Sequence, residues 1–178
     1  MGCLGVETGL VSLQEPAAGL ERLRIVLKRP ERDLGEAELG DPVAGTTRYD
    51  LCLYDDARRP VLALTIDRAG DLCGERPCWS RRTASGFRYV DRRGAADGVL
   101  RILLRGGRLT RGRLVVKAGN RAASGSFPAG AAGALAGATD VTVQLVASDG
   151  ACIGGTLRDV SRADGVTFKA SGPLVSTR

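Results

Sequence analysis

The sequence contains no histidine, and only 4% of its residues are aromatic. Imidazole is the usual general base of Ser-His-Asp and Cys-His hydrolases, and it is a frequent ligand of zinc. The missing histidine therefore excludes those hydrolases and most zinc enzymes. The composition still permits catalysis by carboxylates and a metal site formed by thiolates alone.

Long apolar runs are missing as well. No stretch of about 18 or more apolar residues occurs, so we expect no transmembrane helix. Residues 1–13 lack the basic start and the following apolar stretch of a signal peptide, so we expect no export signal there. The chain has 178 residues, 43% of them apolar, which is enough for one domain with its own core. We expect no cofactor.

Short apolar runs separated by turn residues follow one another from about residue 21. Alternation with a period of two, typical of half-buried strands, occurs in residues 23–28, 47–55, 61–67, 86–91, 99–104, 113–118, 141–145 and 165–170. Ser148-Asp149-Gly150 predicts a hairpin turn after 141–145, because Asp-Gly suits the positive φ angles of such turns. The pattern predicts an all-β fold, an antiparallel sandwich of jelly-roll or Ig-like type with about eight or nine strands. We expect residues 1–20 to be a leader or appendage and residues 21–178 to form a single β domain.

Of the five cysteines, Cys3 lies in the expected leader and the other four lie in the domain. An even number of cysteines within a domain favours disulfides of an exported protein. We favour Cys73 with Cys78, which closes a short loop, and Cys52 with Cys152, which would join two strands. The alternatives are free buried thiols and a zinc site with four thiolates.

Two motifs carry a resemblance: Tyr-x-Leu-Cys-x-Tyr-Asp at residues 49–55 and Cys-Gly-x-x-Pro-Cys-Trp at residues 73–79. With Gly40-Asp41-Pro42, Gly86-Phe87-Arg88-Tyr89 and Asp149-Gly150-Ala151-Cys152, this succession resembles a group of bacterial β domains without an assigned activity. It covers roughly residues 21–172. The resemblance implies an exported protein, extracellular or periplasmic.

Basic residues are concentrated in one segment. The chain has 23 arginines and 3 lysines and a net charge of +6, but residues 81–121 alone carry a net charge of +10. We expect several of these side chains to share one face of a sheet and to attract a polyanion. The alternative is a solvated face that serves solubility. The predicted polyanion-binding residues are Arg88, Arg92, Arg93, Arg101, Arg105, Arg108, Arg111, Arg113 and Lys117; Arg81, Arg82 and Arg121 complete the segment.

The remaining candidate sites are small. Trp79 with Tyr54 would serve a carbohydrate-binding module, but Trp79 beside Cys78 is better explained as a core residue packed on a disulfide. Asp55-Asp56 would serve a carboxylate-dependent hydrolase, but neighbours in a turn rarely converge on one substrate bond. The sequence therefore favours a non-catalytic, exported interaction module without a metal. Its expected partner is an anionic polysaccharide or envelope surface, and nucleic acid is less favoured because exposed aromatic residues are few.

Overall fold

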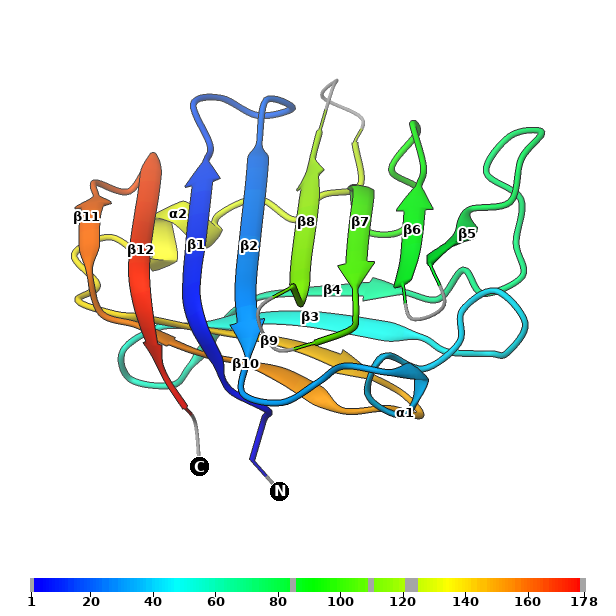
Figure 1. The fold of residues 1–178 in the computed structure, drawn as a ribbon. Helices are drawn as coiled ribbons and strands as arrows, with labels where there is room; N and C mark the ends of the chain where they lie inside the picture. Colours follow the sequence, from blue (N-terminus) through cyan, green and yellow to red (C-terminus); the bar gives the residue numbers. More distant parts are fainter. Residues whose placement is uncertain (1, 84–85, 109–110, 121–124, 177–178) are drawn as a thin grey trace.

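The regular structure of this chain is almost entirely β-strand. The computed structural model describes residues 2–83, 86–108, 111–120 and 125–176, and within them it forms one antiparallel sheet of twelve strands (Figure 1). The strands are β1 (Val6–Gln14), β2 (Arg22–Pro30), β3 (Tyr49–Tyr54), β4 (Pro60–Ile66), β5 (Trp79–Thr83), β6 (Gly86–Val90), β7 (Val99–Arg105), β8 (Arg113–Gly119), β9 (Val141–Ala147), β10 (Cys152–Leu157), β11 (Val160–Ala163) and β12 (Thr167–Val175). Two single-turn helices are present, α1 (Glu36–Leu39) and α2 (Ala131–Ala134).

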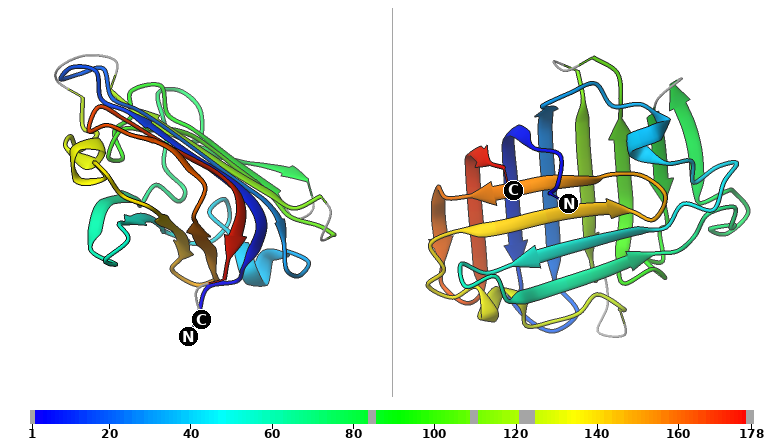
Figure 2. Two further views of the ribbon diagram at one scale, coloured as in Figure 1. Left: turned by 90° about the vertical axis from the view of Figure 1, so that its left-hand side faces the viewer. Right: turned by 90° about the horizontal axis from the view of Figure 1, so that it is seen from below.

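The sheet curls into a half-barrel with two layers. The large layer runs in the order β11-β12-β1-β2-β8-β7-β6-β5, and the small layer in the order β4-β3-β9-β10. The small layer crosses below the large one (Figure 2). The layers are continuous because β10 also pairs with β12, through Thr156 opposite Val175 and Leu157 opposite Leu174. No helix in the described part of the chain has both the length and the apolar character needed to cross a membrane.

The predicted all-β, antiparallel class is confirmed, whereas the expected number of eight or nine strands is too low. Each of the eight runs with period-two alternation overlaps an observed strand. The predicted hairpin is confirmed too, since β9 and β10 pair on either side of Ser148-Asp149-Gly150. Neither a jelly-roll nor an Ig-like arrangement of separate sheets is present, because β10 connects the two layers into one sheet.

β1 is the main difference from the sequence-based expectation. Residues 6–14 lie between β2 and β12 in the middle of the large layer, so describing residues 1–20 as an appendage is wrong for this segment. Val11 and Leu13 face the core, but the next inward position is Gly9, which interrupts the apolar period. Gly9 has tight surroundings, since an added Cβ would lie 2.7 Å from Cδ1 of Leu174.

The core fills the space between the two layers and has an aromatic centre. Trp79 is only 2% exposed, and its ring lies 5.1 Å from the rings of both Tyr49 and Tyr89. Tyr49 donates a hydrogen bond of 2.6 Å to the carbonyl oxygen of Leu39, so α1 is attached to this centre. The interpretation of Trp79 as a core residue is therefore confirmed.

The structure contains two disulfides. Cys73 and Cys78, with Cα atoms 4.8 Å apart, close the short loop before β5, as the sequence favoured. Cys152 bonds to Cys3 instead of Cys52, so the Cys52–Cys152 prediction is wrong and Cys52 keeps a free thiol. The reason is strand order: β9 lies between β3, which holds Cys52, and β10, which begins at Cys152. With two pairs bonded in this way, a zinc site with four thiolates is not formed.

Candidate functional site

The outer surface of the large layer carries a set of basic side chains that we call the basic face. Along β2, Leu23, Ile25 and Leu27 point into the core, and the alternation of side chains therefore turns Arg22, Arg24 and Lys28 outward. On the other strands of this layer, too, side chains that point into the core alternate with side chains that point outward. The basic face consists of Arg22, Arg24 and Lys28 of β2, Arg113 and Lys117 of β8, Arg101 and Arg105 of β7, Arg88 of β6 and Lys169 of β12.

The pairing register aligns six of these residues in two rows that cross β2, β8 and β7. The upper row, nearer the beginning of β2, consists of Arg24, Lys117 and Arg101, and the lower row, nearer the end of β2, of Lys28, Arg113 and Arg105. Neighbours within a row lie on adjacent strands, about 5 Å apart at the backbone. The two rows are separated by four residues along each strand, or roughly 13 Å.

An apolar strip lies between the two rows. Val26 and Val115 point outward but are only 4% and 9% exposed. Leu103, on β7, continues the strip and is half-buried. Long basic side chains cover apolar neighbours with their methylene stems while the charged ends stay in water. We therefore attribute the burial of these valines to the arginine and lysine stems of the two rows.

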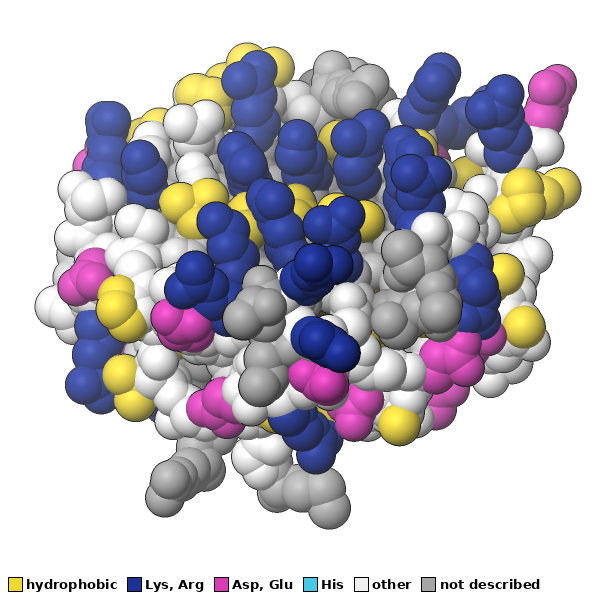
Figure 3. All heavy atoms as spheres, viewed as in Figure 1, with side chains coloured by type: hydrophobic (Ala, Val, Ile, Leu, Met, Phe, Trp, Pro, Cys, Tyr) yellow, Lys and Arg dark blue, Asp and Glu magenta, His cyan; other side chains and the backbone are white. Residues whose placement is uncertain are grey.

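Acidic side chains are nearly absent from this layer. Among the described residues of its eight strands the only acidic one is Glu7, which pairs with Arg29 at 3.0 Å. No residue of the basic face forms an ion pair within the described part of the chain, and the buried Nε of Arg113 has no hydrogen-bond partner there. Figure 3 shows the basic side chains gathered across the middle and upper part of this face, with acidic ones mainly towards its lower rim and edges.

Several arginines elsewhere in the molecule have carboxylate partners. Arg59 lies 2.7 Å from Asp55, and Arg68 lies 3.2 Å from Asp71. Arg81 of β5 is turned away from the basic face: it pairs with Asp41 at 2.6 Å and also with Glu36. Like charges on directly opposed strands destabilise a sheet. The basic face therefore has an unfavourable charge distribution.

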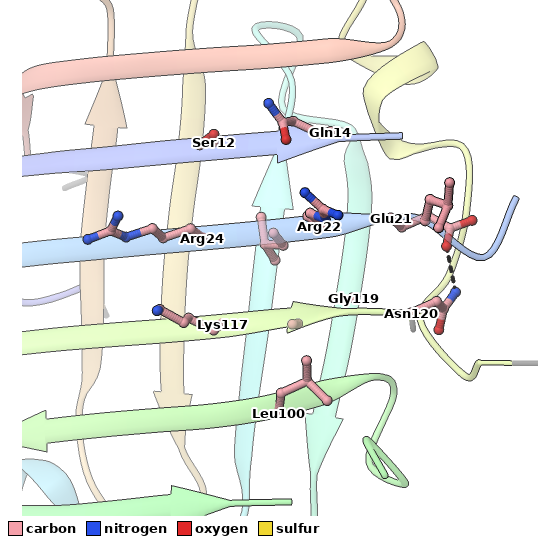
Figure 4. A pocket seen from close by; sticks show the side chains of 12 residues that line it. Ser12, Gln14, Glu21, Arg22, Arg24, Leu100, Lys117, Gly119 and Asn120 are labelled. Carbon is pink, nitrogen blue, oxygen red and sulfur yellow. Dashed lines mark hydrogen bonds between the residues drawn. The ribbon is translucent and has the colours of Figure 1, made fainter. Parts of the chain in front are cut away.

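The upper part of the basic face is hollowed into a groove of about 580 Å³ (Figure 4). Ser12 and Gln14 of β1 line one side, and Lys117 of β8 and Leu100 of β7 line the other. Between them the groove is lined by Arg22, Leu23, Arg24, Ala118 and Gly119, and at its end by Leu20, Glu21 and Asn120. The register fixes this grouping, because Ser12, Arg24 and Lys117 are successive cross-strand partners.

The acidic residue of the groove, Glu21, has its own partners. Its carboxylate accepts hydrogen bonds from the backbone N–H of Gly19 at 3.0 Å and from Nδ2 of Asn120 at 2.8 Å. Burial raises the pKa of Glu21, but the hydrogen bonds from its own backbone N–H, from Asn120 and from Gly19 outweigh it, so the pKa lies below its usual value. Glu21 is therefore ionised at neutral pH and marks the end of the basic face.

The structure brings together about half of the residues predicted to bind a polyanion. Arg88, Arg101, Arg105, Arg113 and Lys117 lie on the basic face. Arg92 and Arg93 lie in the β6–β7 loop, and Arg108 and Arg111 in the β7–β8 loop, which is at the opposite end of the layer. Arg121 lies outside the described residues.

Four members of the basic face were missed: Arg22, Arg24, Lys28 and Lys169. The alternation in residues 23–28 already indicates that basic side chains share the outer face of their strand. It does not indicate that β2 pairs with β8, which is remote in the chain. That alternation identifies Arg24 and Lys28, whereas the place of Arg22 and Lys169 on the face follows only from the pairing of β2 and β12.

The other candidate sites do not assemble. Trp79 is buried, so it cannot act as a surface platform for a sugar, and Tyr54 lies on the small layer. Asp55 accepts hydrogen bonds from Arg59, and although burial raises the pKa of Asp55, these bonds hold it below its usual value. Asp56 instead accepts from Thr139. Asp55 thus serves the β3–β4 turn, and Asp56 links that turn to the segment before β9. In the described residues no group of three or more acidic or cysteine side chains could hold a metal ion.

Comparison with protein-family models, with curated proteins and with solved structures finds no match. The resemblance to exported bacterial β domains stays a prediction, and the candidate site is argued from its geometry.

Proposed function

We propose that this protein is a non-catalytic, exported binding module that holds an extended anionic polymer on the basic face. The observation that supports the proposal is the set of basic side chains on adjacent strands without acidic partners among the described residues. A polyanion would remove the repulsion between neighbouring cations and would release its own counterions on binding.

The extent of the basic face favours a polymer over a small anion. Each row crosses three adjacent strands, so charges follow one another at the inter-strand spacing of about 5 Å. A chain of acidic groups that runs across the strands can meet several cations at once. A single phosphate or sulfate would neutralise only one or two of them.

The chemistry of the surface favours an extracellular polyanion over a nucleic acid. Single-stranded nucleic acids are usually held by aromatic side chains that stack on the bases. The aromatic residues of β6, Phe87 and Tyr89, are both fully buried. The two disulfides are typical of an oxidising compartment outside the cytoplasm. These features support an anionic polysaccharide or another envelope polymer as the partner.

The test is binding to a heparin fragment at several salt concentrations. The variant Arg101→Glu with Arg105→Glu removes one cation from each row. We expect it to weaken binding by about tenfold or more near 0.1 M salt and to reduce the log–log salt slope by about two. Arg76→Glu with Arg158→Glu is the matched control, because it changes the net charge equally at sites away from the basic face.

The control variant should keep near-wild-type binding. The proposal fails if the wild-type protein does not bind heparin at low salt. It also fails if both double variants lose affinity equally, since that result would mean that net charge alone is responsible.

A further inference from the structure

We propose that the groove at the upper end of the basic face is a subsite that takes one acidic sugar residue of the bound polymer. This inference rests on the proposed function and specifies its ligand as an acidic polysaccharide. It is carried by the combination of cations, neutral polar groups and an apolar wall in one groove (Figure 4).

Three cations surround the groove. Arg22 and Arg24 are alternate residues of β2, and Lys117 lies opposite Arg24 on β8. Arginine offers a planar pair of donors to a carboxylate or sulfate, and lysine adds a compact charge. An acidic group in the groove can therefore be bound from two strands.

Two neutral polar side chains, Ser12 and Gln14, line the β1 side of the groove. Ser12 lies opposite Arg24 and Gln14 lies opposite Arg22, so each stands beside a cation. Within the described residues neither side chain forms a hydrogen bond to the protein, although both can donate and accept. Sugar hydroxyls also donate and accept. This pairing of a cation with a neutral donor-acceptor group fits a residue that carries both an acidic group and hydroxyls.

The wall opposite β1 has an apolar part, Leu100, which a bulge in β7 places there. The register shifts between Val99 and Arg101, and Leu100 is the extra residue. Val99 is buried in the core and Leu100 is half-buried and lines the groove. Bulges commonly redirect a side chain in this way. Leu100 can contact the C–H surface of a sugar ring without contributing a charge.

Gly119 keeps the groove open between Arg22 and Leu100. It is the cross-strand partner of Arg22, and it has a φ of +143°. An added Cβ would collide with the carbonyl oxygen of Glu21, so the backbone packing there requires glycine. Beyond it, the ionised carboxylate of Glu21 repels acidic groups, which limits the subsite at this end.

The test compares two probes that share negative charge and differ in hydroxyls. One is a purified oligogalacturonide, and the other is inorganic polyphosphate with a matched number of charges. The variant Ser12→Ala with Gln14→Ala leaves the net charge unchanged. We expect it to weaken oligogalacturonide binding by about tenfold, the effect of two neutral hydrogen bonds, and polyphosphate binding by less than about twofold. Thr8→Ala, on β1 outside this groove, is the matched control and should change neither.

The outcomes separate the two proposals. Equal loss for both probes, or no loss for either, overturns the acidic-sugar subsite while polyphosphate and heparin binding still support the basic face. Wild-type binding of polyphosphate without oligogalacturonide binding also overturns the subsite alone. A wild-type protein that binds neither probe nor heparin overturns both proposals.

Discussion

Two groups of arginine residues in this protein have different environments. Arg59 and Arg81 pair with carboxylates, and Arg81 also lies 4.9 Å from the ring centre of Phe87. Arg24 and Arg101 have only other basic residues as cross-strand neighbours on β8. The first group is explained by the local ion pairs that these arginines form, although exposed ion pairs contribute little to stability. The stems of the second group cover the apolar strip, but their charged ends have no acidic partner within the described part of the fold, which is why they point to a ligand.

Asp164 allows a prediction on pH. Its carboxylate accepts hydrogen bonds from the backbone of Thr167 at 2.7 Å and Val166 at 3.0 Å and from Nε of Arg162 at 2.6 Å. The Thr167 hydrogen bond is the main cause that lowers the pKa of Asp164 from 3.8 to about 2. The ionised form is therefore favoured by folding, and its contribution is complete above pH 3.8 and is lost as the pH falls to about 2.

Asp164→Asn keeps the size of the side chain and removes the titration. In urea unfolding, we expect the stability advantage of the wild-type protein over this variant to be constant above pH 5 and to shrink between pH 3.8 and about 2. A difference that does not vary with pH would show that the Asp164 carboxylate is not stabilised by the β11–β12 turn.

The bonding partner of a single residue could be predicted where that partner is close in the sequence. Cys73 and Cys78 are close in sequence, so their bond required no knowledge of the fold. The partner of Cys152 depends on strand order instead. Cys3 lies next to β10 because Leu4 donates its N–H to the carbonyl oxygen of Cys152 at 2.7 Å. Nothing in the alternation of the sequence indicates that contact.

At the scale of elements, β1 shows why one strand was overlooked. Its sequence combines Gly9 with small polar residues, including Thr8 and Ser12, which gives a weak alternation. Pairing on both sides compensates, since Val11 lies opposite Ile25 of β2 and Ala170 of β12. A central strand obtains its stability from such neighbours, and neighbours are not visible in a short window of sequence.

A pair of substitutions tests the role of β1. Leu13 is fully buried and faces the core, whereas Leu10 is half-buried on the outer side of the same strand. We expect Leu13→Ala to lower the free energy of unfolding by about 2–5 kcal/mol. Leu10→Ala should cost about 1 kcal/mol or less, because the half-buried Leu10 side chain removes less apolar surface from water on folding. Urea denaturation measures both, and equal effects would contradict the central position of β1.

At the scale of the whole molecule, charge is distributed unevenly over two layers. The sequence predicted that arginines of β6, β7 and β8 share a face, because those strands follow one another in the chain. It did not predict the contribution of β2 and β12, which topology adds from elsewhere in the sequence. The candidate site could therefore be predicted in part, and the missing part is the β1–β2 side of the groove.

Chemical modification of arginine tests this distribution directly. With a heparin fragment at about ten times its Kd, we expect phenylglyoxal to modify Arg24, Arg101 and Arg105 about tenfold more slowly. Arg59 and Arg48 have side chains 75% and 49% exposed and lie at the ends of β3 in the small layer, so their rates should not change. Mass spectrometry of the digested protein gives the rate at each site. Uniform protection of all arginines would contradict a single binding face.

The position of β1 between β2 and β12 has a consequence for how the chain is made. β1 is synthesised before all the other strands, but it completes its ladder only when residues 167–175 have left the ribosome. β12 also supplies the pairing that joins the two layers. Until then, β1 has an unpaired edge, which is a site for wrong association between chains.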